Sequence, residues 1–164
     1  METEQINLIK PDLGLSEDTT TNVVNILQRV LADEHVLYMK LRNYHWNVTG
    51  PTFRALHLLF EEQYTQVSTT IDTIAERVRS YGVFALGTMQ AMIEHARLEE
   101  SPNQPSARTM VANLVADHET MVRHLREDID AVDDVNDDGA EDFLTGLLQT
   151  HQSMAWMLRT YLEG

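Results

Sequence analysis

Apolar side chains recur at steps of three and four residues along four long stretches of this 164-residue chain. This period places one continuous apolar stripe on each stretch if it is helical, and no stretch shows the strict alternation that is typical of strands. The chain is therefore predicted to be all-α. The four predicted helices cover about residues 16–44, 51–80, 106–132 and 140–162.

A long connection separates the second and third predicted helices. It covers residues 81–105, contains Gly82 and Gly87, and ends in a segment with two prolines. Because it is too long for a tight turn, it must cross the bundle, and residues 88–97 within it are predicted to form a short extra helix. Four long helices with one long crossover are the arrangement of ferritin-like four-helix bundles.

The chain is predicted to consist of a mobile N-terminal arm, residues 1–15, and one domain, residues 16–164. The arm is polar and interrupted by Pro11 and Gly14, whereas the remainder is long enough to bury a core of its own. There is no cysteine, which excludes disulfides and thiolate metal ligands. The sequence has neither a signal-peptide pattern nor 18 consecutive apolar residues, so a soluble cytoplasmic protein is expected.

Two groups of metal-ligand side chains lie in or just before the second predicted helix. His45, His57 and Glu61 form the first group, and Asp72 and Glu76 form the second. The residues from His57 to Asp72 span about 22 Å at the helical rise of about 1.5 Å per residue. Imidazole and carboxylate ligands lie only about 2.0–2.2 Å from a transition metal, so one chain cannot hold one ion with both groups. The spacing therefore predicts a metal site shared between two subunits.

The candidate ligands of the second helix share one flank. Relative to His57, the side chains of Glu61, Asp72 and Glu76 are turned by about 40°, 60° and 100°, beside the stripe that packs into the bundle. Histidine with several carboxylates suits Fe²⁺ or Mn²⁺, and Zn²⁺ and Cu²⁺ bind such donors more tightly. Each residue alone has an ordinary explanation: a solvated carboxylate, a partner of arginine, or a buried hydrogen-bonded histidine.

Ferritins carry Glu-x-x-His motifs on two helices of the bundle, and this chain has none. Its motifs resemble those of the Dps family of miniferritins instead. Members of that family form hollow dodecamers with ferroxidase centres between two-fold related subunits, so the resemblance implies the same assembly here. It rests on Tyr-His-Trp-Asn-Val-Thr-Gly at 44–50, Phe53, Ala-Leu-His at 55–57, Asp-Thr-Ile-Ala-Glu-Arg at 72–77 and Ala-Leu-Gly-Thr at 85–88.

By this resemblance, His45, His57 and Glu61 of one subunit would bind iron together with Asp72 and Glu76 of another. Trp46 would lie close by and shield the site or quench radicals. The family usually has Asp at the position of Glu61, which leaves the occupancy of the second metal position open.

The resemblance also assigns a role to the acidic turn before the last predicted helix. Asp133, Asp138 and Asp142 would line a negatively charged pore at a three-fold axis, through which Fe²⁺ enters the shell. A solvated acidic turn is the ordinary alternative.

The predicted function is that of a ferroxidase. It would bind Fe²⁺, oxidise it with hydrogen peroxide or dioxygen, and store ferric oxyhydroxide inside a dodecamer, protecting the cell against oxidative damage. Zn²⁺ or Mn²⁺ could occupy the same site. An inert helical scaffold, in which the histidines and carboxylates are merely solvated, is one alternative.

A DNA-compacting particle is the second alternative, and the charge of the chain disfavours it. The sequence has 12 Lys and Arg against 26 Asp and Glu, a formal charge of −14, with one Lys and no Arg in its first 28 residues. Lys and Arg contacts to phosphates supply most of the affinity for DNA, so binding would require a divalent cation between the two anionic surfaces.

Overall fold

The computed structural model describes residue 6 and residues 8–163. All regular structure in these residues is helical, so the all-α prediction is confirmed. None of the described helices combines the length and the hydropathy that crossing a bilayer requires. The helices are α1 (Glu17–Asn47), α2 (Phe53–Ser80), α3 (Met89–His95), α4 (Ala107–Asp133) and α5 (Asp138–Leu162).

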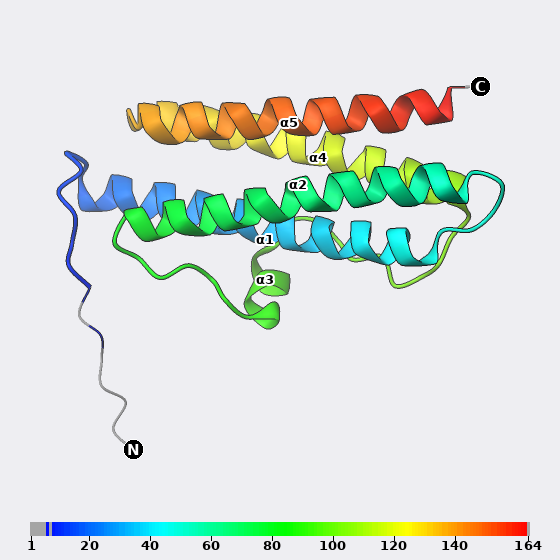
Figure 1. The fold of residues 1–164 in the computed structure, drawn as a ribbon. Helices are drawn as coiled ribbons and strands as arrows, with labels where there is room; N and C mark the ends of the chain where they lie inside the picture. Colours follow the sequence, from blue (N-terminus) through cyan, green and yellow to red (C-terminus); the bar gives the residue numbers. More distant parts are fainter. Residues whose placement is uncertain (1–5, 7, 164) are drawn as a thin grey trace, which may run out of the picture.

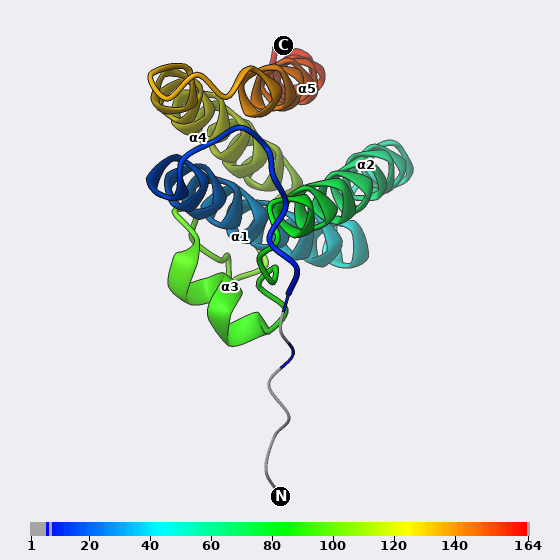
Figure 2. The same cartoon turned by 90° about the vertical axis from the view of Figure 1, so that its left-hand side faces the viewer.

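The four long helices form a bundle of two pairs. α1 packs along α2, and α4 packs along α5 (Figure 1). The chain then crosses the length of the bundle between α2 and α4, and α3 lies outside the bundle against α1 (Figure 2). This is the predicted four-helix bundle with a short extra helix in the crossover.

Side chains that cap the helix N-termini explain where three of the long helices begin. Ser16 Oγ, Ser106 Oγ and Asp137 Oδ1 each accept a hydrogen bond from the backbone N–H three residues on, at 3.0, 3.2 and 3.0 Å. The second helix was expected to include Pro51 and begins two residues later. Gly50, with φ +106°, forms a turn there in which the amide of Phe53 donates to the Gly50 carbonyl at 3.0 Å.

Arg97 anchors the crossover to the bundle. Its Nε donates to Asp33 of α1 at 2.8 Å, and its Nη2 donates to Asp128 of α4 at 2.8 Å. Both carboxylates are buried, and removing one partner of a buried ion pair typically costs about 3–5 kcal/mol. The crossover is therefore held in one place on α1, close to the groove described below.

The described part of the N-terminal arm, which is not helical, meets the end of α2. Gly82 has φ +77°, and a Cβ built there would lie 2.6 Å from Cδ of Pro11, so glycine suits both the backbone and the contact. Residues 1–5 and 7 of the predicted arm lie outside the described residues. The mobility of the arm, and its separation from a single domain, stay predictions.

Candidate metal centre

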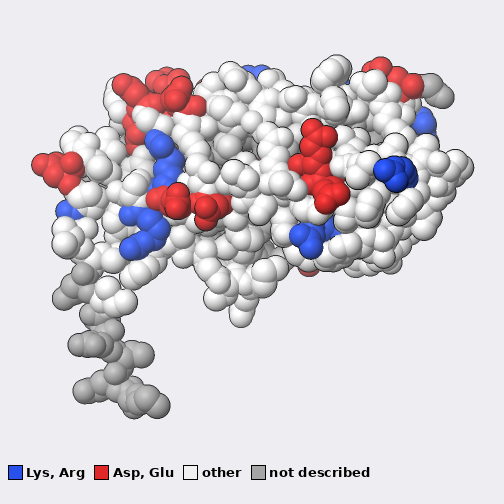
Figure 3. Space-filling view, viewed as in Figure 1, with Lys and Arg blue, Asp and Glu red and all other residues white. Residues whose placement is uncertain are grey.

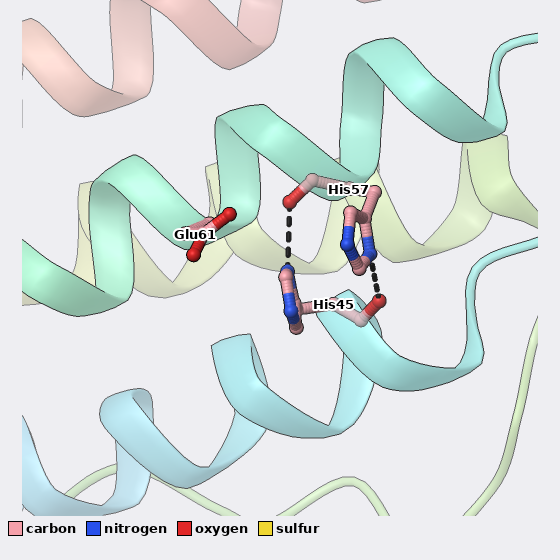
Figure 4. A group of neighbouring side chains, drawn as sticks. All are labelled: His45, His57 and Glu61. Atoms are coloured by element: carbon pink, nitrogen blue, oxygen red, sulfur yellow. Dashed lines mark hydrogen bonds between the residues drawn. The ribbon is translucent and has the colours of Figure 1, made fainter.

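His45 and His57 face each other where the last turns of α1 meet the first turn of α2 (Figure 4). Nδ1 of His45 lies 2.8 Å from the carbonyl oxygen of His57, and Nδ1 of His57 lies 2.9 Å from the carbonyl oxygen of His45. The rings stack, with centroids 3.8 Å apart and planes 18° from parallel. A carbonyl can only accept, so Nδ1 is the donor in each ring, and in the neutral imidazole Nε2 is the nitrogen that keeps a lone pair. Both rings are thereby prepared as Nε2 ligands.

Glu61 completes a cluster of three candidate ligands. One ligand atom from each of His45, His57 and Glu61 lies within 4.8 Å of the others, the only such group of three or more among the described residues. His45 is buried, His57 is half-buried and Glu61 is exposed. The cluster is therefore open on the side of Glu61, where further ligands can reach an ion.

Aromatic side chains and one arginine surround the cluster. Tyr64 Oη donates to Glu61 Oε1 at 3.3 Å, and its ring meets the His45 ring edge-on at 5.2 Å. The Arg42 guanidinium lies over the rings of Tyr64 and Trp46, at 4.7 and 4.9 Å. Burial, and then the Glu61 carboxylate, raise the pKa of Tyr64, so its hydroxyl remains a donor. The indole of Trp46 is 56% exposed, beside the cluster but open to other molecules.

Asp72 and Glu76 do not join the cluster within one chain. Both are exposed and lie further along the uninterrupted helix α2. Asp72 lines a groove of about 650 Å³ between α1, α2 and the crossover, which is also lined by His35 and Thr88. The structure thus brings together three of the five predicted ligands and leaves the other two further along α2.

The three predicted pore residues lie around the turn between α4 and α5. Asp133 ends α4, Asp138 begins α5, Asp142 follows one turn later, and all three are exposed. Acidic side chains gather over the end of the molecule where α5 begins (Figure 3). Asp137 between them has a different role, because it caps α5 and accepts a hydrogen bond from Tyr81 Oη at 2.6 Å.

Sequence reasoning missed a second pair of histidines. The Nδ1 atoms of His118 on α4 and His151 on α5 lie 3.0 Å apart in the core. Burial lowers the pKa of His118 well below its usual range. The sequence does indicate that both histidines are buried, since both fall on the apolar stripes of their helices. Their pairing depends on the register between α4 and α5, which the spacing within each helix does not reveal.

Comparison with known proteins identifies the family. The ferritin-like domain family matches residues 24–164. An uncharacterized low temperature-induced protein of Nostoc sp. is 46% identical over 93% of this chain and 87% of its own length. The DNA protection during starvation protein of Brevibacillus brevis is 40% identical over 86% of this chain and 95% of its own length. The chain belongs to the Dps family of ferritin-like proteins.

Solved Dps structures share the fold as well. The Dps protein from Vibrio cholerae O1, described as a member of a broad superfamily of ferritin-like diiron-carboxylate proteins, superposes with a TM-score of 0.88 at 26% identity. The match covers 96% of this chain and 99% of that protein. The Dps resemblance and the ferritin-like bundle predicted from the sequence are therefore confirmed, whereas the roles of the individual site residues stay predictions.

Proposed function

We propose that this chain is a ferroxidase that binds Fe²⁺ as its substrate between two subunits and stores the ferric product inside a hollow, cytoplasmic dodecamer. The orientation of His45 and His57 carries the proposal: because Nδ1 of each ring donates to a backbone carbonyl, Nε2 is the nitrogen left to bind a metal beside the Glu61 carboxylate. The description of the Vibrio relative as a ferritin-like diiron-carboxylate protein supports iron as the metal.

The length of α2 supports a site shared between subunits. A two-fold axis that brings Asp72 and Glu76 of one subunit to the histidines of a second also brings those of the second to the first. Each pair of subunits would then hold two equivalent sites, about 22 Å apart, as far as the two groups are separated along α2. The open side of the cluster at Glu61 is where the second subunit would supply its carboxylates.

The donors suit the oxidation of Fe²⁺. Neutral imidazoles accept Fe²⁺ without losing a proton, and carboxylates from both subunits offset the added positive charge when it becomes Fe³⁺. Two Fe²⁺ ions each give one electron to one hydrogen peroxide, which takes up two protons and leaves as two waters. Dioxygen is the alternative oxidant. Consuming Fe²⁺ and peroxide together suppresses hydroxyl-radical formation, while Zn²⁺ and Mn²⁺ would compete for the same donors.

The charge distribution supports a route for the substrate. The chain has a formal charge of −14, and Asp133, Asp138 and Asp142 are exposed at one end of the molecule. In a dodecamer these side chains would line the pore at the three-fold axis and concentrate Fe²⁺ there.

DNA compaction is the second candidate function, because the Brevibacillus relative is named for the protection of DNA. The acidic charge opposes it. We expect no retardation of duplex DNA in a gel at about 50 mM salt, where proteins that contact phosphates bind most tightly. Retardation that fades as salt is added would favour compaction.

The first test of the ferroxidase is oxidation by the assembled protein. Fe²⁺ is added without oxygen, peroxide or air follows, and ferric absorbance is recorded for wild type and for His57→Ala/Asp72→Ala. The control, His95→Ala/Asp130→Ala, replaces an exposed histidine and an exposed aspartate outside the cluster. Wild type and control should form a soluble ferric core much faster than buffer, and the site variant should not. If wild type matches buffer, the ferroxidase is excluded.

Mixed assemblies test whether two subunits share the site. In a pair made of one His57→Ala and one Asp72→Ala subunit, one site carries both changes and the other is intact. Random co-refolding of the two variants should therefore recover about a quarter of the wild-type sites, although each variant alone has none. No recovery in the mixture would contradict the shared site even if each single variant is inactive.

A further inference from the structure

His35 of α1 and Asp72 of α2 line the same groove, which lies between these two helices and the crossover. Asp72 is exposed there, and His35 is half-buried. In the shared site proposed above, the carboxylate of Asp72 is one of the donors that one subunit offers to the histidines of another. A second subunit that reaches Asp72 therefore brings its own metal ligands into the groove that His35 also lines.

The ring of His35 is held so that Nε2 is the nitrogen left to bind a metal. Its Nδ1 lies 2.9 Å from the carbonyl oxygen of Leu31, one turn earlier in α1. A carbonyl can only accept, so Nδ1 is the donor, and in the neutral imidazole Nε2 keeps a lone pair. His45 and His57 are held by backbone carbonyls in the same way. All three histidines are therefore oriented as Nε2 ligands.

The side chains of His35 and Asp72 lean toward each other along the groove. α1 and α2 run antiparallel from the stacked rings of His45 and His57 (Figure 1). From that pair, His35 lies about 15 Å back along α1 and Asp72 about 22 Å onward along α2, in the same direction, so the two are offset by only about 7 Å. Side chains in helices point toward the N-terminus of their own helix, which shortens this offset. Neither residue can reach the cluster of its own chain.

We infer that His35 is a sixth ligand of the shared site, contributed by the subunit that supplies Asp72 and Glu76. The inference rests on the ferroxidase site proposed above and names one more of its ligands. It raises the number of protein donors from five to six, three for each of two ions. Three histidine and carboxylate donors with open coordination positions are typical of Fe²⁺ centres that react with oxygen. His35 thus supports the second ion, whose occupancy Glu61 leaves open.

Binding of Co²⁺ to the assembled protein tests the inference. Co²⁺ binds the same donors as Fe²⁺, somewhat more tightly, and its visible absorption band depends on its ligands. We expect His35→Gln to bind one of the two ions at least about tenfold more weakly, with a changed band, because a nitrogen ligand is lost.

His95→Gln is the matched control. Nδ1 of His95 also lies 2.9 Å from the carbonyl oxygen four residues earlier, that of Ala91. His95 is exposed on α3 and is not part of the groove lining. This variant should bind Co²⁺ as the wild type does, with the same band.

Mixed assemblies show which subunit supplies His35. Co-refolding His35→Gln with His57→Ala should restore about a quarter of the sites to wild-type affinity, because one site of each mixed pair carries both changes and the other is intact. Co-refolding His35→Gln with Asp72→Ala should restore none, because each site of a mixed pair then carries one change. The reverse pattern would assign His35 to the cluster of its own subunit and contradict the inference.

Other results would also overturn the inference, and they are distinct from a failure of the shared site. If His35→Gln binds Co²⁺ as the wild type does while His57→Ala/Asp72→Ala does not, the shared site stands and His35 only packs between subunits. Weaker binding with an unchanged band would mean that His35 shapes the groove without touching the ion. If the wild type neither binds Co²⁺ nor oxidises Fe²⁺, the shared site itself is excluded.

A second measurement covers a variant that does not assemble. His35→Gln is then co-refolded with an excess of wild-type subunits, which supply the shell. The changed Co²⁺ band should grow with the fraction of variant subunits. A band that stays constant as this fraction rises would exclude His35 as a ligand.

Discussion

The two histidine pairs of this chain use the same ring in opposite ways. In the rim pair, His45 and His57, each Nδ1 donates to a backbone carbonyl, which leaves each Nε2 as the candidate metal ligand. In the core pair, His118 and His151, each Nε2 faces a side chain and the Nδ1 atoms face each other. The rim rings stack at 3.8 Å, whereas the core rings lie 5.2 Å apart and 43° from parallel.

This difference shows what holds each pair in place. Backbone carbonyls are fixed by the helices themselves, so the rim pair needs only the packing of α1 against α2. The core pair depends on side chains from all four long helices, which must be in register. We therefore expect substitutions in the rim pair to slow iron oxidation with little loss of stability. Substitutions in the core pair should lower the stability of the protein.

His151→Ala should have the largest effect, a loss of about 3–5 kcal/mol in the free energy of unfolding, because it leaves Glu34 buried without its partner and opens a cavity. His57→Ala should cost about 1 kcal/mol or less, since it removes one hydrogen bond at a half-buried position. Urea unfolding of both metal-free variants at one protein concentration measures the difference. Equal losses would show that the core pair does not depend on its side-chain partners.

For the rate of iron oxidation we expect the opposite order: a substitution in the rim pair should have the larger effect. His57→Ala is expected to slow Fe²⁺ oxidation by about 100-fold or more, as loss of a ligand outweighs the 10–100-fold typical of its supporting residues. The His57 carbonyl still accepts from His45, so only one ligand is lost. His151→Gln should oxidise Fe²⁺ at the wild-type rate. A matching decrease in His151→Gln would connect the core pair to the oxidation.

The features that repeat within one helix could be predicted from the sequence. Apolar periodicity located the four long helices, and the spacing from His57 to Asp72 correctly separated the two ligand groups within one chain. The short helix at residues 89–95 was expected because the crossover is too long for a turn. In each case a period or a count along one helix was sufficient.

Features that depend on the register between helices could not be predicted. The bonds of Arg97 to Asp33 and Asp128 join residues from three parts of the fold, and nothing local to any of them marks the partners. The same is true of Glu34, whose position in an apolar stripe was the only hint of its hydrogen bond with His151. Cross-helix polar contacts of this kind became visible only once the helices were placed together.

Glu61→Asp should have a modest effect, because it shortens the one exposed ligand of the rim cluster by a single methylene and keeps its charge. We expect less than a tenfold change in the affinity for Fe²⁺, about 1.4 kcal/mol at most. Glu61→Ala, which removes the charge, should weaken binding further. Anaerobic Fe²⁺ titration of the two variants separates length from charge, and equal losses would show that the position requires the longer side chain.

Tyr64→Phe should have the smallest effect, about a threefold weaker binding of Fe²⁺, because it removes a single long hydrogen bond to an exposed carboxylate. The raised pKa of Tyr64 keeps its hydroxyl protonated, so the hydrogen bond persists across the neutral range. Tyr38→Phe is the matched control, since the Tyr38 ring packs edge-on against Tyr64 at 6.1 Å while its hydroxyl accepts from Arg42 at 2.9 Å. A loss in Tyr64→Phe as large as in Glu61→Ala would mean that the rim cluster also depends on side-chain support. The rim pair and the core pair would then differ only in their exposure to solvent.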